Sequence, residues 1–248
     1  MTLEEFFHQN PRAALAFSGG VDSAYLLYAA LQSGAQVRAY YVKSAFQPQF
    51  ELDDARRLAE QCHADLCVLE LDVLADSQVT ANPANRCYYC KKRIFTAIQE
   101  AARRDGFSVL LDGTNASDDA GDRPGMRALT ELDVRSPLRE CGLTKEEIRR
   151  LSKETGLFTW NKPAYACLAT RIPSGTVITA GALWTTETAE NFLFSLGFTD
   201  FRIRMTGKTA KIQLPENQLE RAIALRKEIV GELKNYYDAV VLDLEVRG

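Results

Sequence analysis

Residues 14–23 read ALAFSGGVDS: an apolar run ends at Ser18, two glycines lead to Asp22 and Ser23, and a second apolar stretch begins at Tyr25. Glycines lack a Cβ atom, so the backbone there turns tightly and comes close to a ligand. The pattern predicts a strand, a tight turn and a helix. The N–H groups at the start of such a helix attract anions, and a phosphate is the natural ligand.

The side chains of this turn fit the same ligand. Ser18 and Ser23 offer hydroxyl donors, Gly19 and Gly20 allow close approach, and Asp22 is a candidate ligand for a Mg²⁺ ion on phosphates. The Gly-Lys-[Ser/Thr] ending of a Walker loop is absent. The motif instead resembles the PP-loop of the ATP pyrophosphatases. That resemblance implies cleavage of ATP between the α- and β-phosphates, transfer of AMP to a substrate oxygen, and release of pyrophosphate.

The composition is that of a globular protein, with 248 residues, 46% of them hydrophobic and 25% charged. A net charge of −3 gives no basic footprint of the kind that tRNA-binding proteins show. No apolar run reaches transmembrane length, and the first residues lack the pattern of a signal peptide. We therefore expect a cytoplasmic protein whose partners are neither nucleic acid nor membrane. Its six cysteines are expected to be thiols or ligands.

Strand and helix patterns alternate through the first half of the chain. The strands are expected at residues 13–17, 37–42, 67–71 and 109–111, and the helices at 23–32, 52–62 and 90–104. This alternation predicts an α/β fold with a parallel sheet. A polar, glycine-containing loop, residues 112–119, follows the fourth strand. Ligands gather at the carboxyl edge of such a sheet, so we expect Gly113 to bind ATP beside the first turn.

The second half begins with a capping box from Thr144 to Glu147, which predicts a helix. The segment 161–175 contains several helix breakers and reads as irregular. After it we expect a helix at 179–196, strands at 201–205 and 210–214, a helix at 217–233 and a strand at 239–246. The pattern predicts an α/β domain over residues 1–175 and a smaller α+β domain over residues 176–248.

Cys87 and Cys90 form a Cys-x-x-Cys motif. By itself it fits a redox dithiol, half of a zinc site, or two ligands of an iron–sulfur cluster. A third cysteine, Cys167, lies in the irregular segment. Three thiolates would leave one iron of a [4Fe–4S] cluster open to an exogenous sulfide. Spacing alone favours the simpler interpretation, in which Cys167 is a small buried hydrophobic residue.

Several motifs taken together resemble the LarE family of PP-loop enzymes. Besides residues 18–23 they are CYYCKKR at 87–93, DGTN at 112–115, DRPG at 122–125, WNKP at 160–163, CLATRIPSG at 167–175, FRIR at 201–204 and QLPE at 213–216. The resemblance covers nearly the whole chain. It implies a PP-loop ATP pyrophosphatase domain, similar to adenine nucleotide alpha hydrolases, followed by a smaller α+β domain.

The resemblance also implies a function, that of a sulfurtransferase in the synthesis of the nickel-pincer nucleotide cofactor. ATP and Mg²⁺ would adenylylate a carboxylate of pyridinium-3,5-biscarboxylic acid mononucleotide, and sulfur would then replace AMP to leave a thiocarboxylate. Cys87, Cys90 and Cys167 would act in catalysis by holding a [4Fe–4S] cluster that carries the donor sulfide. A small-molecule nucleotide substrate and a homo-oligomer are expected.

Arg171, Arg202 and Arg204 are the expected substrate-binding residues, because guanidinium groups pair with carboxylates and phosphates. Arg202 and Arg204 alternate on a strand and share a face, although such a face is as well explained by simple solvation. The family's acidic metal-binding residues in this region map only partly: Glu190 matches, but Gln213 stands where a carboxylate is expected.

Three other functions compete with this one. A tRNA thiolase of the same superfamily also carries three cysteines, but the acidic composition argues against it. An ammonia-using synthetase shares the PP-loop and has no use for the cysteine motif. A non-catalytic nucleotide sensor with redox-active cysteines would bind ATP and release no pyrophosphate.

Overall fold

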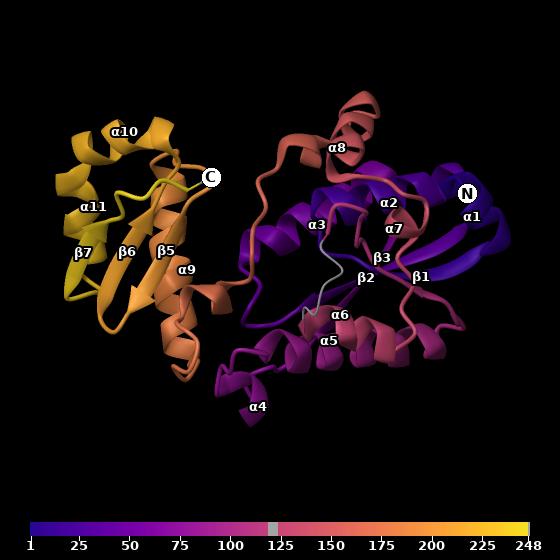
Figure 1. Ribbon diagram of the computed structural model, residues 1–248, viewed down its shortest axis with the longest axis horizontal. Coiled ribbons are helices and arrows are strands. Elements are labelled where there is room, and N and C mark those ends of the chain that lie inside the picture. Colours follow the sequence, from indigo (N-terminus) through magenta and orange to yellow (C-terminus); the bar gives the residue numbers. More distant parts are fainter. Residues whose placement is uncertain (119–123, 248) are drawn as a thin grey trace. The chain divides into compact units, whose positions relative to one another are not determined.

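The computed structural model describes residues 1–118 and 124–247, and its contacts divide the chain into two units (Figure 1). Unit 1 comprises Met1–Val73 and Asn85–Lys162, and unit 2 comprises Leu74–Ala84 and Pro163–Gly248. Two members of the DRPG motif, Asp122 and Arg123, lie outside the described residues.

Unit 1 is built around a parallel sheet in the order β3-β2-β1-β4. Its strands are β1 (Arg12–Ala16), β2 (Gln36–Lys43), β3 (Asp65–Glu70) and β4 (Leu110–Leu111). Its helices are α1 (Leu3–Gln9), α2 (Val21–Gln32), α3 (Gln49–Cys62), α5 (Arg86–Arg104), α6 (Pro124–Glu131), α7 (Pro137–Glu140), α8 (Lys145–Glu154) and the 3₁₀ turn η1 (Phe158–Asn161). The predicted α/β class and parallel sheet are confirmed.

Helices cover both faces of this sheet (Figure 1). Ala13 and Leu15 of β1 point into a core formed with α1, α2, α3 and α8, whereas Ala14 points into a second core formed with α5 and α6. Because both faces are buried, the strands consist of continuous apolar runs rather than alternating ones. This three-layer arrangement brings the carboxyl ends of β1 and β4 to one edge.

Unit 2 holds a three-stranded sheet in the order β5-β6-β7, antiparallel between the first pair and parallel between the second. Its elements are α4 (Ser77–Thr80), η2 (Leu168–Arg171), α9 (Ala180–Ser195), β5 (Arg202–Thr206), β6 (Thr209–Gln213), η3 (Glu216–Gln218), α10 (Leu219–Ala224), α11 (Arg226–Leu233) and β7 (Ala239–Leu242). Ile203, Ala210 and Ile212 face a core shared with α9, α10 and α11.

The contacts divide the chain between Lys162 and Pro163, whereas the sequence suggested a boundary near Gly175. Residues 163–175 pack with β5 and α9, so they belong to unit 2. The segment Leu74–Ala84 joins them through Asn82. The buried Asn82 side chain donates to the carbonyl oxygen of Pro173 (2.8 Å), and the Asn82 backbone carbonyl oxygen accepts from the Gly175 N–H (2.8 Å).

Two predicted elements are shorter than expected. The predicted helix at 217–233 is broken into η3, α10 and α11, with Leu225 in a non-helical conformation between the last two. The last strand, β7, ends at Leu242 instead of residue 246. Among the described residues, none of the helices combines the length and the hydrophobicity that a membrane crossing requires.

Candidate active site

The serines of the PP-loop close the turn between β1 and α2. The Ser18 and Ser23 hydroxyl oxygens lie 3.1 Å apart, and Ser23 Oγ donates to the carbonyl oxygen of Gly20 (3.2 Å). Gly20 is the N-cap of α2 and has no side chain to cap it. The first-turn N–H groups of α2 therefore remain available at the helix end, where anions bind.

Two glycines of the site leave no room for a side chain. A Cβ atom added to Gly113 would lie 2.9 Å from the backbone nitrogen of Ser23, closer than real Cβ contacts allow. Gly19 has a φ of +71°, and a Cβ atom there would lie 3.2 Å from the backbone of Ala55. The loop after β4 thus lies directly against the PP-loop, as its place in the sequence predicted, while the part of Gly113 in ATP binding stays a prediction.

Asp22, the expected Mg²⁺ ligand, is paired with a cation. Lys145 Nζ lies 2.5 Å from Asp22 Oδ2, and Asn115 Nδ2 donates to Oδ1 (3.3 Å). The backbone N–H of Lys145 donates to Ser117 Oγ (2.9 Å), which ties the start of α8 to the loop after β4. Sequence reasoning missed Lys145. The one sequence feature that bears on Lys145 is the Thr144–Glu147 capping box, which makes Lys145 the first residue of α8.

Cys87 and Cys90 lie in the first turns of α5, one exposed and one half-buried. Residues three apart on a helix share a face, so the two side chains project from the same side. The sequence predicted a helix over residues 90–104, and α5 confirms it with a start at Arg86.

The start of α5 is anchored to α6 through Glu131. Tyr88 donates its hydroxyl to Glu131 Oε2 (2.7 Å), Arg127 Nε donates to Oε1 (2.9 Å), and Lys92 Nζ lies 3.2 Å from Oε2. The hydrogen bonds from Tyr88, Arg127 and Lys92 lower the pKa of Glu131 to about 2. The carboxylate is therefore charged at neutral pH and holds the Cys-x-x-Cys turn against its neighbouring helix.

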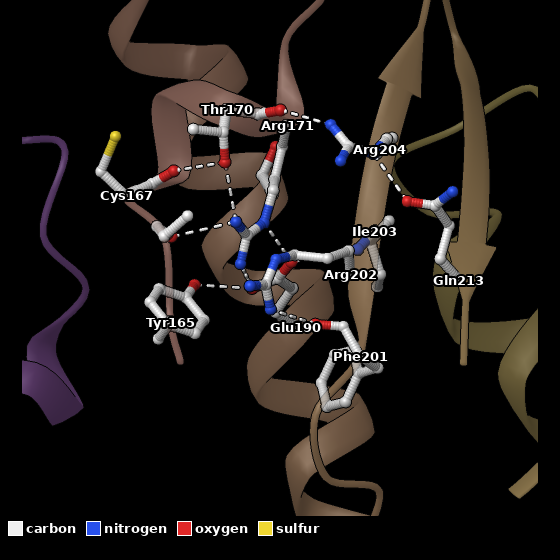
Figure 2. Close-up of polar contacts among 12 residues, drawn as sticks. Tyr165, Cys167, Thr170, Arg171, Glu190, Phe201, Arg202, Ile203, Arg204 and Gln213 are labelled. Carbon is white, nitrogen blue, oxygen red and sulfur yellow. Dashed lines mark hydrogen bonds and ion pairs between the residues drawn. The ribbon is translucent and has the colours of Figure 1, made fainter. Parts of the chain in front are cut away.

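Cys167 caps the short 3₁₀ turn η2 in unit 2, and its backbone is held by hydrogen bonds (Figure 2). The Cys167 carbonyl oxygen accepts from the Thr170 hydroxyl (2.8 Å) and from the Thr170 N–H (3.0 Å). Arg171 Nη1 donates to Thr170 Oγ1 (2.9 Å) and to the carbonyl oxygen of Ala166 (3.0 Å). The side chain of Arg171 thus supports the backbone around Cys167.

The three predicted substrate arginines differ in their surroundings. Arg171 is buried against Glu190, and Arg202 is buried with its guanidinium donating to the carbonyl oxygen of Ala164 (2.8 Å). Burial and the charge of Arg171 lower the pKa of Arg202 to about 10. Arg204 is exposed, and it donates to the Thr170 carbonyl oxygen (2.8 Å).

The acidic residues near these arginines have protein partners. Both oxygens of Glu190 accept from Arg171, and Gln213 donates from Nε2 to Asp243 Oδ2 (2.7 Å). Within either unit, the described residues include no group of three His, Cys, Asp or Glu side chains that could hold a metal ion. The structure places Cys87 and Cys90 in unit 1 and Cys167 in unit 2, and the convergence of the three sulfurs stays a prediction.

Comparisons with known proteins show which family the chain resembles. A family model described as queuosine biosynthesis protein QueC matches residues 12–96. The matched residues include the PP-loop and the first part of α5, with its Cys-x-x-Cys motif. The chain is 36% identical to an uncharacterized protein of Synechocystis, over 98% of this chain and 92% of that one. It is 34% identical to the pyridinium-3,5-bisthiocarboxylic acid mononucleotide synthase of Lactiplantibacillus plantarum, over 94% of this chain and 86% of the relative. The chain belongs to the LarE family.

As a LarE family member, the chain is an ATP-using sulfurtransferase with a PP-loop domain. The likeness to the Lactiplantibacillus protein extends through unit 2, so both units belong to the family's pattern. A tRNA-specific 2-thiouridylase of Clostridium botulinum is 26% identical over 60% of this chain and 51% of its own length. The matched part of that relative is therefore only about half of a longer protein.

Proposed function

We propose that this LarE family protein converts pyridinium-3,5-biscarboxylic acid mononucleotide into a thiocarboxylate for nickel-pincer nucleotide synthesis. In the first half of the reaction, a carboxylate oxygen of the substrate bonds to the α-phosphorus of ATP, and pyrophosphate leaves. In the second half, a sulfur nucleophile bonds to the activated carbonyl carbon, and AMP leaves. The similarity to the Lactiplantibacillus pyridinium-3,5-bisthiocarboxylic acid mononucleotide synthase supports this choice of substrate.

The PP-loop residues would serve the first half. The α2 N-terminus and the hydroxyls of Ser18 and Ser23 would bind the departing pyrophosphate, which carries most of the developing charge. Asp22 offers hard carboxylate oxygens of the kind that Mg²⁺ prefers, and the ion would displace Lys145 Nζ from Oδ2. The displaced ammonium would stay close enough to face the phosphates.

The cysteines would serve the second half. Cys87, Cys90 and Cys167 are soft thiolate donors and suit an iron–sulfur cluster. When bound, a [4Fe–4S] cluster on three thiolates would supply a sulfide at its open iron. Cys87 and Cys90 lie three residues apart in the first turns of α5, which supports their use as two ligands of one cluster. The structure holds Cys167 at a fixed backbone turn, which supports its use as a ligand rather than as core filling.

Arg204 and Arg202 would bind the phosphate or carboxylates of the substrate, with Arg204 as the exposed contact. Arg171 is buried, so it would contribute to substrate binding indirectly, by holding Ala166 and Thr170 in place. The cytoplasmic location and the homo-oligomeric state expected above belong to the same proposal. Size-exclusion chromatography with light scattering tests the second of these.

The observation that carries the proposal is the PP-loop at an uncapped helix start with Gly113 packed against Ser23. The test supplies ATP, Mg²⁺, substrate and sulfide under anaerobic conditions and resolves nucleotides by chromatography and the thiocarboxylate by mass spectrometry. We expect AMP and pyrophosphate in step with thiocarboxylate, and loss of product in Cys87→Ala, Cys90→Ala and Cys167→Ala. Cys67→Ala, on β3, is the matched control. ADP as the main product would end the proposal.

A tRNA thiolase is the second candidate, and the match to the Clostridium 2-thiouridylase favours it. The same assay separates the two functions when tRNA replaces the small nucleotide. Sulfur incorporated into tRNA, with none in the mononucleotide, would favour the thiolase.

A further inference from the structure

We infer that Glu190 is a positioning residue for Cys167, and that it acts through Arg171 and Thr170. The inference rests on the proposed role of Cys167 in sulfur transfer. Glu190 lies on α9, nineteen residues beyond Arg171 in the sequence, and it pairs with the Arg171 guanidinium group. Figure 2 shows the chain of contacts from Glu190 through Arg171 to the turn that carries Cys167.

The Glu190 carboxylate has four donors, two on each oxygen. Oε1 accepts from Arg171 Nε (2.7 Å) and from the Ile203 N–H (3.0 Å). Oε2 accepts from Arg171 Nη2 (3.1 Å) and from the Tyr165 hydroxyl (2.6 Å). The paired bonds to Arg171 fix the plane of its guanidinium group, because two parallel bonds allow one orientation.

That orientation aims Nη1 of Arg171 at the segment before η2. Nη1 donates to the Ala166 carbonyl oxygen and to Thr170 Oγ1, and Thr170 Oγ1 in turn donates to the Cys167 carbonyl oxygen. Each bond in this series has normal length, between 2.8 and 3.0 Å. Three successive contacts, from Glu190 to Arg171, from Arg171 to Thr170 and from Thr170 to Cys167, therefore link the carboxylate to the Cys167 backbone.

Stability alone does not account for this buried pair. The Arg171 and Glu190 side chains are 0% and 1% exposed, and two such ions lose their hydration on folding. A buried ion pair is often no more stabilising than apolar side chains of the same volume. Apolar side chains could not make the directional hydrogen bonds that this pair makes. The hydrogen bonds of this pair end on Tyr165, Ala166 and Thr170, which flank Cys167, and on β5.

The test measures how fast iodoacetamide alkylates Cys167 in the full chain prepared without iron, by mass spectrometry of the Cys167 peptide. Glu190→Gln removes the charge that orients Arg171. Thr170→Val removes only the hydroxyl link and leaves the buried ion pair in place, so it tests the route even if Glu190→Gln fails to fold. Glu228→Gln, which changes an exposed carboxylate on α11, is the matched control.

We expect alkylation of Cys167 to be at least threefold faster in Glu190→Gln and at least twofold faster in Thr170→Val, because a looser turn exposes the sulfur more often. Sulfur transfer should fall in both variants through kcat, with the KM for ATP unchanged. Glu228→Gln should match the parent protein in every measurement. A purely structural role would lower the melting temperature of Glu190→Gln without moving the rates in Thr170→Val.

Unchanged alkylation and unchanged kcat in a folded Thr170→Val protein would overturn the inference. The proposed function fails separately, and it fails if Cys167→Ala keeps full turnover. An inactive Cys167→Ala protein together with an unaffected Thr170→Val protein would leave the proposed function standing and remove Glu190 from it.

Discussion

Two ion pairs beside predicted functional residues, Lys145–Asp22 in unit 1 and Arg171–Glu190 in unit 2, are built differently. In unit 1, Lys145 meets Asp22 through one nitrogen and one oxygen, with side chains 36% and 21% exposed. In unit 2, Arg171 meets Glu190 through two nitrogens and two oxygens, with both side chains buried. Lysine is a flexible point charge, whereas arginine is a planar fork that locks an orientation.

The difference in burial and geometry between the two ion pairs fits the roles proposed for Asp22 and Cys167. A half-exposed pair with a single contact is weak and exchanges readily, so Asp22 can give up its lysine when a metal and ATP arrive. A buried bidentate pair does not open to take a new partner, since opening it would leave two buried charges without hydration. The pair at the PP-loop can therefore open when a ligand binds, whereas the pair next to Cys167 keeps its turn in one conformation.

The largest effect is expected from Arg171→Met, which leaves the Glu190 carboxylate buried without a cation. Removing one partner of a buried pair costs about 3–5 kcal/mol of unfolding free energy. Urea denaturation measures it. The chain has two tryptophans, and in a Trp160→Phe background Trp184 on α9 is the only one left, so its fluorescence reports on unit 2.

The control is Lys208→Met, which opens the exposed pair with Asp238 in the same unit. That change should cost less than about 1 kcal/mol, because exposed pairs are screened by water. ATP binding should survive in both variants. If Arg171→Met lost no more stability than Lys208→Met, burial would not distinguish the Arg171–Glu190 pair from an exposed one.

A smaller effect is expected from Gly113→Ala, which tests the preformed backbone of the PP-loop. The added Cβ atom would lie 2.9 Å from the Ser23 nitrogen, so the turn or the loop must shift. A shift that costs about 1.4 kcal/mol weakens ATP binding tenfold. Calorimetric titration with a non-hydrolysable ATP analogue measures the change.

Gly231→Ala on α11 is the matched substitution, since a Cβ atom there meets nothing within 4 Å. It should leave ATP binding unchanged and raise stability by up to about 1 kcal/mol, because alanine favours helix. Equal ATP affinity in Gly113→Ala and the parent protein would mean that the loop after β4 does not shape the nucleotide site.

The two sites were not equally predictable from sequence. The PP-loop was found because its chemistry is local: six consecutive residues supply the turn, the hydroxyls and the carboxylate. The Arg171–Glu190 pair was not found, since nothing in the sequence joins the two residues and charged side chains are usually exposed. Arg171 was instead expected to contact substrate, and its buried contacts with Ala166 and Thr170 became visible only in the fold.

The fold shows the same division. Continuous apolar strands with helices between them predicted the parallel sheet, because burial on both faces imposes that pattern. The break at Leu225 was missed since no glycine or proline marks it. The union of Leu74–Ala84 with unit 2 was missed as well, because it depends on the hydrogen bonds of one buried side chain, Asn82.

The smallest effect is expected from Lys145→Gln. Its ammonium is half-exposed and screened, so its contribution to holding the phosphates of ATP should be about 1 kcal/mol, or roughly a fivefold rise in the KM for ATP. Added salt should reduce the difference between variant and parent, because ions screen an exposed charge more than a buried one. Lys153→Gln, on the last turn of the same helix, is the control. A KM for ATP that is unchanged at low salt would show that Lys145 only neutralises Asp22, and the pair in unit 1 would then be as self-contained as the pair in unit 2.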